Sequence, residues 1–127
     1  MPRLCVVLRK AYGGAYIVMD SRGLGTDWCG AWPTAEIAVM GASPAVQVLH
    51  RRALDAITDP AARVEEQQAL ETEYSDRFLN PYVAAERGYV DEVIAASDTR
   101  RVLARALGHL RTKREVQPTR RHSNTPL

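Results

Sequence analysis

An uninterrupted apolar run, Leu4 to Leu8, is followed after four intervening residues by the glycine pair Gly13 and Gly14. The run is rich in β-branched residues, which is typical of a strand buried on both faces, as in parallel sheets. The glycines then open a helix-compatible segment that reaches Met19. A buried strand followed by a helix predicts a layered α/β arrangement.

The rest of the chain continues the alternation of short strands and helices. Residues 20–25 have the Asp, Ser and Gly composition of a turn. The further predicted elements are strands around 31–32 and 36–40, helices over 43–52 and 59–78, a helical turn over 81–88, a short strand within 89–94, and a last helix that begins at Ser97 or Asp98. Together they predict an α/β domain of short strands with flanking helices.

The predicted helices have recognisable starts and apolar faces. Asp59 followed by Pro60 is a helix start, and Leu70, Tyr74 and Phe78 form one apolar stripe at intervals of four residues. The residues expected to be buried in the helix over 43–52 and in the last helix are Val46, Val48, Leu49, Val102, Leu103, Ala106, Leu107 and Leu110.

A single domain accounts for the length of 127 residues. We expect it to occupy residues 1–112, with residues 113–127 forming an extended basic tail that contains almost no large apolar residue. About four short strands are few for a sheet whose first strand is buried on both faces. The sequence therefore predicts that this chain is part of a larger fold.

The charge and hydropathy of the sequence limit the classes of partner that we expect this chain to bind. The net charge is +2, from 17 basic and 15 acidic residues, which gives no reason to expect nucleic acid. No stretch approaches the ~18 apolar residues of a membrane helix, and no signal segment is visible, so we expect a cytoplasmic protein without a membrane partner. Cys5 and Cys29, which lack a metal-ligand spacing, are expected to be reduced and mostly buried.

Two glycines before a helix have a possible chemical use. Backbone N–H groups at a helix start lack an internal partner and carry partial positive charge, so they can hold a developing oxyanion. Gly13 and Gly14, followed by the small Ala15, would present these groups without side-chain obstruction. The alternative is a tight turn that binds nothing. Dinucleotide-binding, phosphate-loop and nucleophile-elbow motifs are absent from the sequence.

Other polar residues give weaker signals. His50, His109 and His122 lie far apart, without the helical spacing of a metal site, and we expect no metal. The acidic pairs 65–66 and 91–92 are expected to be solvated charges, and Arg51–Arg52 a solvated helix C-terminus rather than a phosphate site. The basic residues of the tail lack interleaved aromatic residues, so anchoring against a partner subunit is the better interpretation.

Five ordered segments carry a resemblance to a known family: VVLRKAYGGAYIVM, AWPTAEIAVMGA, NPYVAAERGYVDEVI, TRRVLARAL and LRTKRE. They resemble the C-terminal end of the carboxyltransferase β subunit of biotin-dependent acyl-CoA carboxylases, the acetyl-CoA and propionyl-CoA carboxylase group. The likeness runs over almost the whole chain. It is weakest at residues 26–30 and 53–66 and at the ending HSNTPL.

The resemblance implies part of a crotonase-like (ClpP/crotonase) domain that handles carboxybiotin, in an enzyme that moves a carboxyl group to the α carbon of acetyl-CoA or propionyl-CoA. By this resemblance the N–H groups of Gly14 and Ala15, with Gly13 beside them, would hold the ureido oxygen of biotin. Ile17 would face the acyl pocket, although a core-facing isoleucine is equally compatible. The implied partners are acyl-CoA, a biotin carboxylase or biotin carboxyl carrier subunit, and further copies of the same subunit.

Members of this family are much longer than the present chain, and the resemblance begins midway through their C-terminal domain. We therefore expect a truncated product or fragment that is inactive alone. Two alternatives stay open. One is the carboxyltransferase of a biotin-dependent decarboxylase, and the other is a non-catalytic fragment that docks on an intact carboxylase.

Overall fold

The computed structural model describes residues 1–114 of the chain. In chain order the elements are β1 (Leu4–Val7), β2 (Lys10–Tyr12), α1 (Gly13–Val18), the 3-10 helix η1 (Arg22–Leu24), β3 (Trp28–Ala31), β4 (Glu36–Ala38), α2 (Ala42–Leu49), α3 (Arg51–Asp55), α4 (Pro60–Phe78), α5 (Pro81–Glu86), β5 (Glu92–Val93), the 3-10 helix η2 (Ala96–Asp98) and α6 (Thr99–His109). The predicted α/β class, with short strands and flanking helices, is confirmed. Residues 115–127 of the predicted tail lie outside the described residues.

The strands form two small parallel sheets. The larger has the order β1-β3-β5, and the smaller pairs β2 with β4. In the larger sheet Cys5 is in register with Cys29, and Val7 with Ala31. In the smaller sheet Lys10 is in register with Glu36. Parallel pairing throughout agrees with the strand–helix alternation of the sequence.

The core lies where the sheets meet α1 and α5. Its buried members are Val7, Ala11, Cys29, Ala31, Ala35, Ala84 and Val90, with Cys5, Tyr16, Ile37 and Ala85 packed against them. Directly after β3, the indole N–H of Trp32 donates to the Thr99 hydroxyl over 2.9 Å, and Val102 of α6 is buried. This hydrogen bond connects the start of the last helix to the end of β3.

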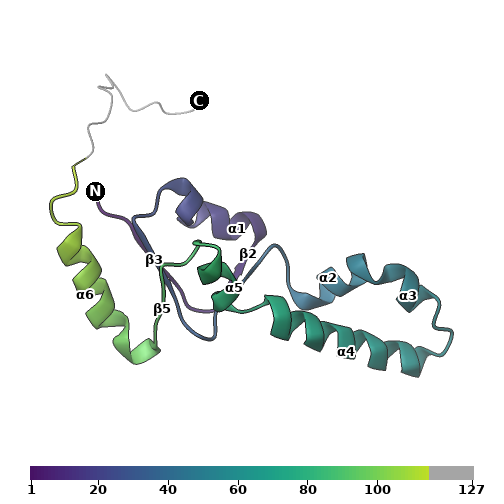
Figure 1. Cartoon of the computed structure of the whole chain (residues 1–127). Helices are drawn as coiled ribbons and strands as arrows, with labels where there is room; N and C mark the ends of the chain where they lie inside the picture. Colours follow the sequence, from purple (N-terminus) through teal and green to yellow (C-terminus); the bar gives the residue numbers. More distant parts are fainter. Residues whose placement is uncertain (115–127) are drawn as a thin grey trace, which may run out of the picture.

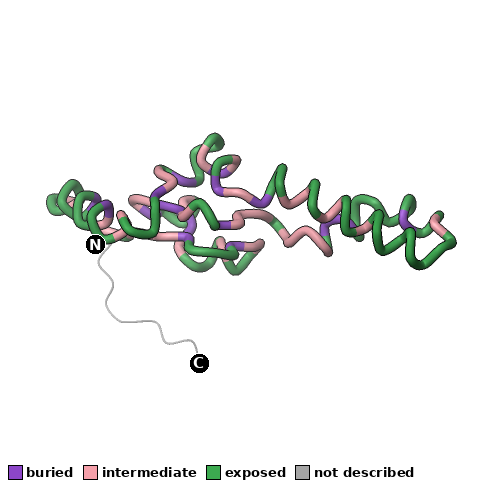
Figure 2. The backbone as a smooth tube through the Cα atoms, turned by 90° about the horizontal axis from the view of Figure 1, so that it is seen from below, coloured by how far each residue is buried: buried purple, intermediate pink, exposed green. Residues whose placement is uncertain are grey.

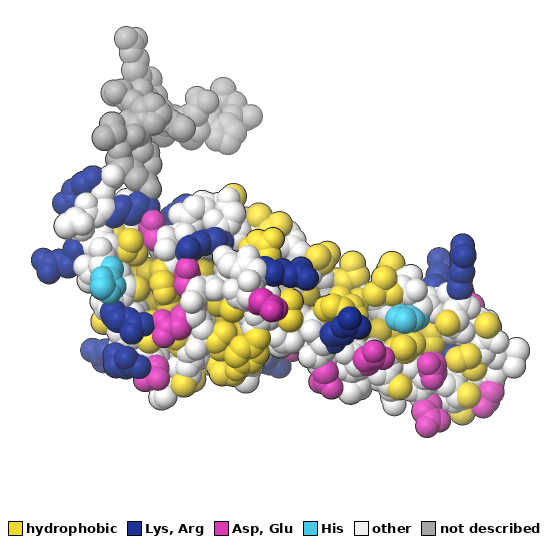
Figure 3. All heavy atoms as spheres, in the orientation of Figure 1, with side chains coloured by type: hydrophobic (Ala, Val, Ile, Leu, Met, Phe, Trp, Pro, Cys, Tyr) yellow, Lys and Arg dark blue, Asp and Glu magenta, His cyan; other side chains and the backbone are white. Residues whose placement is uncertain are grey.

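The molecule is elongated. Figure 1 shows α6 at one end of the sheets and an arm formed by α2, α3 and α4 projecting from the other end. The tube coloured by burial shows buried backbone concentrated around the strands, while most of the arm is exposed (Figure 2). Lys and Arg side chains gather at the end that carries α6, and apolar atoms occupy much of the middle (Figure 3).

Local capping explains where two helices begin. The Asp59 carboxylate accepts from the N–H groups of Ala61 and Ala62, each over 3.3 Å, and Pro60 starts α4. The Asn80 side-chain oxygen accepts from the first-turn N–H groups of α5 over 3.1 Å, again with a proline at the first position. These side chains satisfy donors that a helix start leaves unpaired, which confirms both predicted starts.

Two strand predictions need correction. β1 is not buried on both faces: it pairs only with β3 among the described residues, and of its four residues only Val7 is buried. An edge strand has one side without a neighbouring strand, so the apolar composition of this run does not show that β1 is buried on both faces. β2 was not predicted, because Lys10 to Tyr12 contains no β-branched residue, and it is defined by its pairing with β4.

The expected apolar faces are only partly covered. Val46 is buried, but Val48 and Leu49 are 70% and 66% exposed, so their predicted burial was wrong. In the last helix Val102 and Ala106 are buried, whereas Leu107 is 47% exposed. The stripe of α4 is half-buried at Leu70 and Tyr74, and Phe78 is exposed at the end of the helix. The helices have the predicted amphipathic character, but the described chain lacks enough neighbours to cover it.

Candidate functional site

The turn from β2 into α1 requires a glycine at position 13. Gly13 has φ +55°, in the left-handed region that residues with a Cβ rarely adopt. A Cβ added there would also lie 3.0 Å from the Val39 carbonyl oxygen, which closes the space behind the turn. Gly13 therefore lets the backbone reverse its course directly after the strand and start a helix.

The next two residues, Gly14 and Ala15, face open space. Both are exposed, and a Cβ added at Gly14 would meet no atom within 4 Å. They lie in the first turn of α1, where backbone N–H groups have no partner inside the helix, and no side chain caps this helix. Among residues 1–114 neither N–H donates to an acceptor outside α1. The geometry thus leaves two adjacent donors available to a ligand.

Two hollows flank α1. The first has a volume of about 320 Å³ and is lined by the segment 5–12 together with Ala15, Tyr16 and Met19. The second, of about 400 Å³, is lined by Gly13, Tyr16, Ile17, Ile37, Ala38, Val39, Val83, Ala84, Arg87 and Tyr89. Ala15 borders one hollow and Gly13 the other, whereas Gly14 belongs to neither lining. Ile17 is 52% exposed and lines the second hollow.

Tyr12 and Glu36 fix the entry into α1, and sequence reasoning missed both. Tyr12 is the residue that precedes the first turn of α1, and its hydroxyl donates to the Glu36 carboxylate on β4. Burial and this contact with Glu36 raise the pKa of Tyr12 to about 12, so the phenol stays protonated. The pairing of β2 with β4 would have indicated this contact, but strand pairing cannot be read directly from the sequence.

The remaining candidates lie away from α1. His50 and His109 are exposed and far apart in the fold, and His122 is outside the described residues. Arg51 and Arg52 begin α3 rather than ending the preceding helix, because α2 stops at Leu49, so that prediction was wrong. Residues 65–66 are exposed on α4. In residues 1–114 no three His, Cys, Asp or Glu side chains gather as metal ligands.

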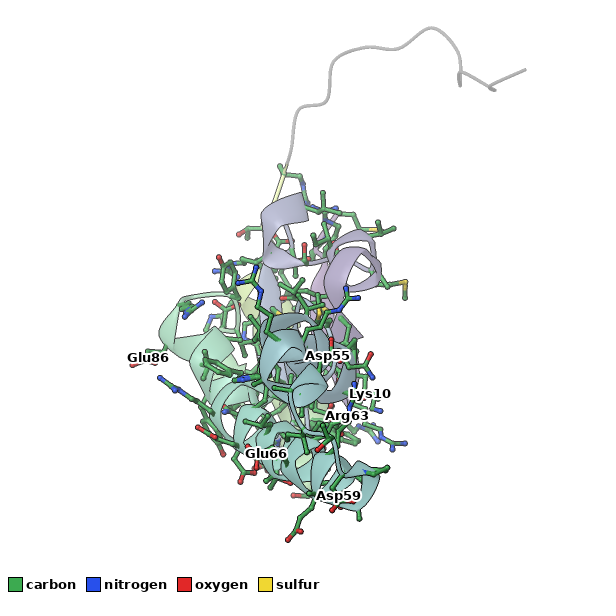
Figure 4. All side chains as sticks on the ribbon, turned by 90° about the vertical axis from the view of Figure 1, so that its right-hand side faces the viewer. Lys10, Asp55, Asp59, Arg63, Glu66 and Glu86 are labelled. Atoms are coloured by element: carbon green, nitrogen blue, oxygen red, sulfur yellow. The ribbon has the colours of Figure 1, made fainter. Side chains whose placement is uncertain are left out.

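In the arm, arginine side chains pair with a carboxylate of the same chain. Asp55 of α3 accepts from Arg63 of α4 over 2.9 Å and lies 3.8 Å from Arg51 (Figure 4). Asp91 likewise accepts from Arg22 over 2.6 Å and from the N–H of Cys29 over 2.8 Å. Both carboxylates have structural partners, and neither points to acid–base chemistry.

None of the helices within residues 1–114 is long and apolar enough to cross a bilayer.

Comparison with known proteins identifies the family. The model of the carboxyl transferase domain matches residues 1–125. The chain is 53% identical over 127 residues to the propionyl-CoA carboxylase carboxyltransferase subunit of Haloferax mediterranei, covering 100% of this chain and 24% of that protein. It is 54% identical over 128 residues to the propionyl-CoA carboxylase beta chain of Saccharopolyspora erythraea, covering 100% of this chain and 23% of that protein.

A solved structure gives the same result. The crystal structure of the hexameric transcarboxylase 12S, with methylmalonyl-coenzyme A bound, superposes with a TM-score of 0.84 at 49% identity, over 100% of this chain and 24% of that one. The crotonase-like fold expected from the sequence is therefore confirmed for this portion. The chain spans about a quarter of the length of these relatives. With a family model that covers residues 1–125, this chain belongs to the carboxyl transferase domain family.

Proposed function

We propose that this chain supplies the biotin-binding portion of a carboxyltransferase in a biotin-dependent acyl-CoA carboxylase. The observation that carries the proposal is the open first turn of α1, where the N–H groups of Gly14 and Ala15 have no acceptor outside the helix. Gly13, at φ +55° and close to the Val39 carbonyl oxygen, allows the helix to start directly after β2. Family membership supports the same assignment.

The residues present fit the ureido group of biotin. A carbonyl oxygen that gains negative charge needs preorganised donors, and two adjacent N–H groups at a helix start provide them without side-chain movement. Gly14 leaves room for a ring, because nothing lies within 4 Å of the position that a Cβ would take. When bound, carboxybiotin supplies the carboxyl group to be transferred. Loss of one such donor typically lowers the rate by ~10² to 10³.

We assign the second hollow to the acyl group. Ile17, Ile37 and Val39 make much of its wall apolar, which suits a short acyl chain, and Arg87 is the charged residue of the lining. Ile17 is half-exposed and lies one helical turn from Gly13 and Gly14, so its size would limit the chain that fits. The preferred substrate is then acetyl-CoA or propionyl-CoA.

The proposed partners follow from the same assignment. Catalysis in the cytoplasm would need acyl-CoA, a biotin carboxylase and biotin carried on a carrier subunit or domain. Val18, Met19 and Val39 are each more than 70% exposed around α1, an apolar surface that further copies of the subunit or the remainder of the carboxyltransferase would cover. Because the chain spans about a quarter of its relatives, we expect the 127 residues alone to show no turnover.

Complementation tests the proposed function. A homologous β chain that lacks its matching last quarter is mixed with this chain, and methylmalonyl-CoA formation from propionyl-CoA is measured with the carboxylase partner subunits. Recovery of turnover with wild type, and at least ~10²-fold less with Gly14→Pro, supports the role of the amides. Gly14→Ala is the matched control, because it keeps the N–H and meets no atom within 4 Å.

A binding measurement removes the dependence on assembly. In ¹⁵N NMR spectra of the chain, titration with d-biotin should shift the Gly14 and Ala15 amide resonances more than any in α4. Desthiobiotin, which keeps the ureido carbonyl, should reproduce these shifts, and valeric acid should not. Shifts confined to other residues would contradict the proposal.

The match to transcarboxylase 12S supports a second candidate, in which the same site takes a carboxyl group from methylmalonyl-CoA for transfer to carrier-borne biotin. The complementation mixture distinguishes the two reactions. Turnover that requires a biotin carboxylase and ATP favours the carboxylase, and turnover from methylmalonyl-CoA to a carrier without ATP favours the transcarboxylase.

A further inference from the structure

Two thiols that are 24 residues apart in sequence meet on neighbouring strands. Cys5 of β1 is in register with Cys29 of β3. Neighbouring strands lie about 4.8 Å apart, which is within the usual Cα separation of a disulfide of about 4.4 to 6.8 Å. Residues in register on parallel strands direct their side chains to the same face of the sheet. Both cysteines are free thiols.

The two thiols differ in access. Cys29 is fully buried, with 0% of its surface exposed. Cys5 is half-buried and lines the hollow of about 320 Å³ that Ala15 and Tyr16 also line. A small oxidant can therefore reach the sulfur of Cys5 from solvent. The sulfur of Cys29 is enclosed in the folded chain and is not accessible from solvent.

The pKa values of the two thiols are shifted in opposite directions. A hydrogen bond from the Cys29 thiol lowers the pKa of Cys5 to about 7, although burial and the charge of Asp20 act against this change. The shared hydrogen bond and burial raise the pKa of Cys29, so it keeps its proton. Asp91 adds to that rise and Arg22 opposes it. Near neutral pH the accessible thiol is thus the one that ionises.

The hollow beside Cys5 also contains a hydroxyl group without a hydrogen-bond partner. The hydroxyl oxygen of Tyr16 is buried and has no hydrogen-bond partner within the described part of the chain. Burial raises the pKa of Tyr16, so the hydroxyl remains a donor. Tyr16 packs against the cluster that contains Cys29 and lines the same hollow as Cys5. A donor without an acceptor here suits an oxygen added to Cys5.

We propose that Cys5 and Cys29 are a redox-active dithiol, in which Cys5 reacts with hydrogen peroxide and Cys29 resolves the product to an intramolecular disulfide. The Cys5 sulfur attacks one peroxide oxygen; the S–O bond forms, the O–O bond breaks, and hydroxide leaves and is protonated to water. The Cys29 sulfur then loses its proton and attacks the Cys5 sulfur; the S–S bond forms, the S–O bond breaks, and a second water leaves.

In this sequence two thiols are oxidised by two electrons and one peroxide is reduced to two waters. The product joins the edge strand β1 to β3 beside the hollow that Ala15 borders. The proposal needs no biotin and no acyl-CoA, so it stands or fails independently of the proposed carboxyltransferase function.

Mass spectrometry of the peroxide-treated chain tests the proposal. The folded wild-type chain should lose two hydrogen atoms, and a non-reducing tryptic digest should link the peptides 4–9 and 23–51. Cys29→Ser should instead gain one and then two oxygen atoms at Cys5. Cys5→Ser should react at least ~10-fold more slowly than wild type, because Cys29 is enclosed.

Reaction in guanidinium chloride supplies the control for folding. There the two thiols should react at similar rates, and circular dichroism confirms that the chain in buffer is folded. The proposal is overturned if the folded wild type gives intermolecular dimers or sulfinic acid instead of the linked peptides. It is also overturned if Cys5→Ser reacts as fast as wild type in buffer, or if Cys29 in the Cys5→Ser variant reacts as fast in buffer as in guanidinium chloride.

Discussion

Lys113 Nζ lies 2.6 Å from Asp27 Oδ1, and this ion pair joins residues that are 86 positions apart. Lys113 follows α6, and Asp27 immediately precedes β3. The other carboxylate oxygen of Asp27 accepts from the N–H of Arg3, just before β1, over 2.8 Å. One carboxylate thus connects the two ends of the described chain, and the first residue of the predicted tail is part of the fold.

Replacing Lys113 with alanine should destabilise the fold in a pH-dependent way. Lys113 and the N–H of Arg3 lower the pKa of Asp27 from its usual 3.8. This stabilisation is fully present above pH 3.8 and is lost as the pH falls through the lower folded value. Urea unfolding should show a clear difference between Lys113→Ala and wild type at pH 7, shrinking in acid. Arg114→Ala, a change at an exposed neighbour, should have a smaller effect at both pH values.

Alanine at the two adjacent glycines should have opposite effects. Gly13→Ala forces a residue with a Cβ into the left-handed region and against the Val39 oxygen, which should cost about 1 to 2 kcal/mol or more in unfolding free energy. Gly14→Ala meets no atom within 4 Å and removes a flexible residue from a helix, so it should be neutral or stabilising by about 0.5 to 1 kcal/mol. Denaturant titration measures both. Equal losses would contradict the structure at this turn.

The start of α4 should depend on the Asp59 side chain. Asp59→Ala removes the acceptor for two first-turn N–H groups and should cost about 0.5 to 2 kcal/mol. Asp59→Asn keeps a side-chain oxygen and should retain most of that stability. Hydrogen exchange at Ala61 and Ala62 gives a local measurement, and equal acceleration in both variants would exclude the cap.

Alkylation of Cys5 should have a midpoint near pH 7 in the folded chain, because the Cys29 thiol stabilises the Cys5 thiolate. Cys29→Ala removes that donor and should raise the midpoint towards the ordinary thiol value of about 8.5. Cys29→Ser keeps a hydroxyl donor and should give an intermediate midpoint. Iodoacetamide rates from pH 5.5 to 9.5 provide the profile. A wild-type midpoint above pH 8 would contradict the hydrogen bond.

Features that depend on neighbouring residues could be predicted from the sequence. Asp59–Pro60 and Asn80–Pro81 place helix starts correctly, because capping involves only the next few residues. The start of a helix at Gly13 and Gly14 was likewise predictable, because the glycine pair and the apolar segment after it are neighbours in sequence, although β2, the strand directly before them, was not predicted. These elements define the candidate site, and the family resemblance indicated its chemistry.

Features that depend on distant residues could not be predicted in this way. Val48 and Leu49 fit the apolar pattern of α2, but whether they are buried depends on what covers that side of the arm. Tyr12 meets Glu36, and Cys5 meets Cys29, only through strand register, which a spacing of 24 residues does not reveal. Gly14 and Ala15 lie in the first turn of α1, and the binding of biotin by their N–H groups stays a prediction.

The register of β1 with β3 also provides a simple test of strand alignment in the sheet. A slip of one position would bring Leu4 or Val6 opposite Cys29 and send the Cys5 sulfur to the reverse side. Cross-linking the two sulfurs would then fail even in a chain with intact helices. Any variant or fusion of this polypeptide can thus be checked for correct strand alignment with a thiol reagent and a gel.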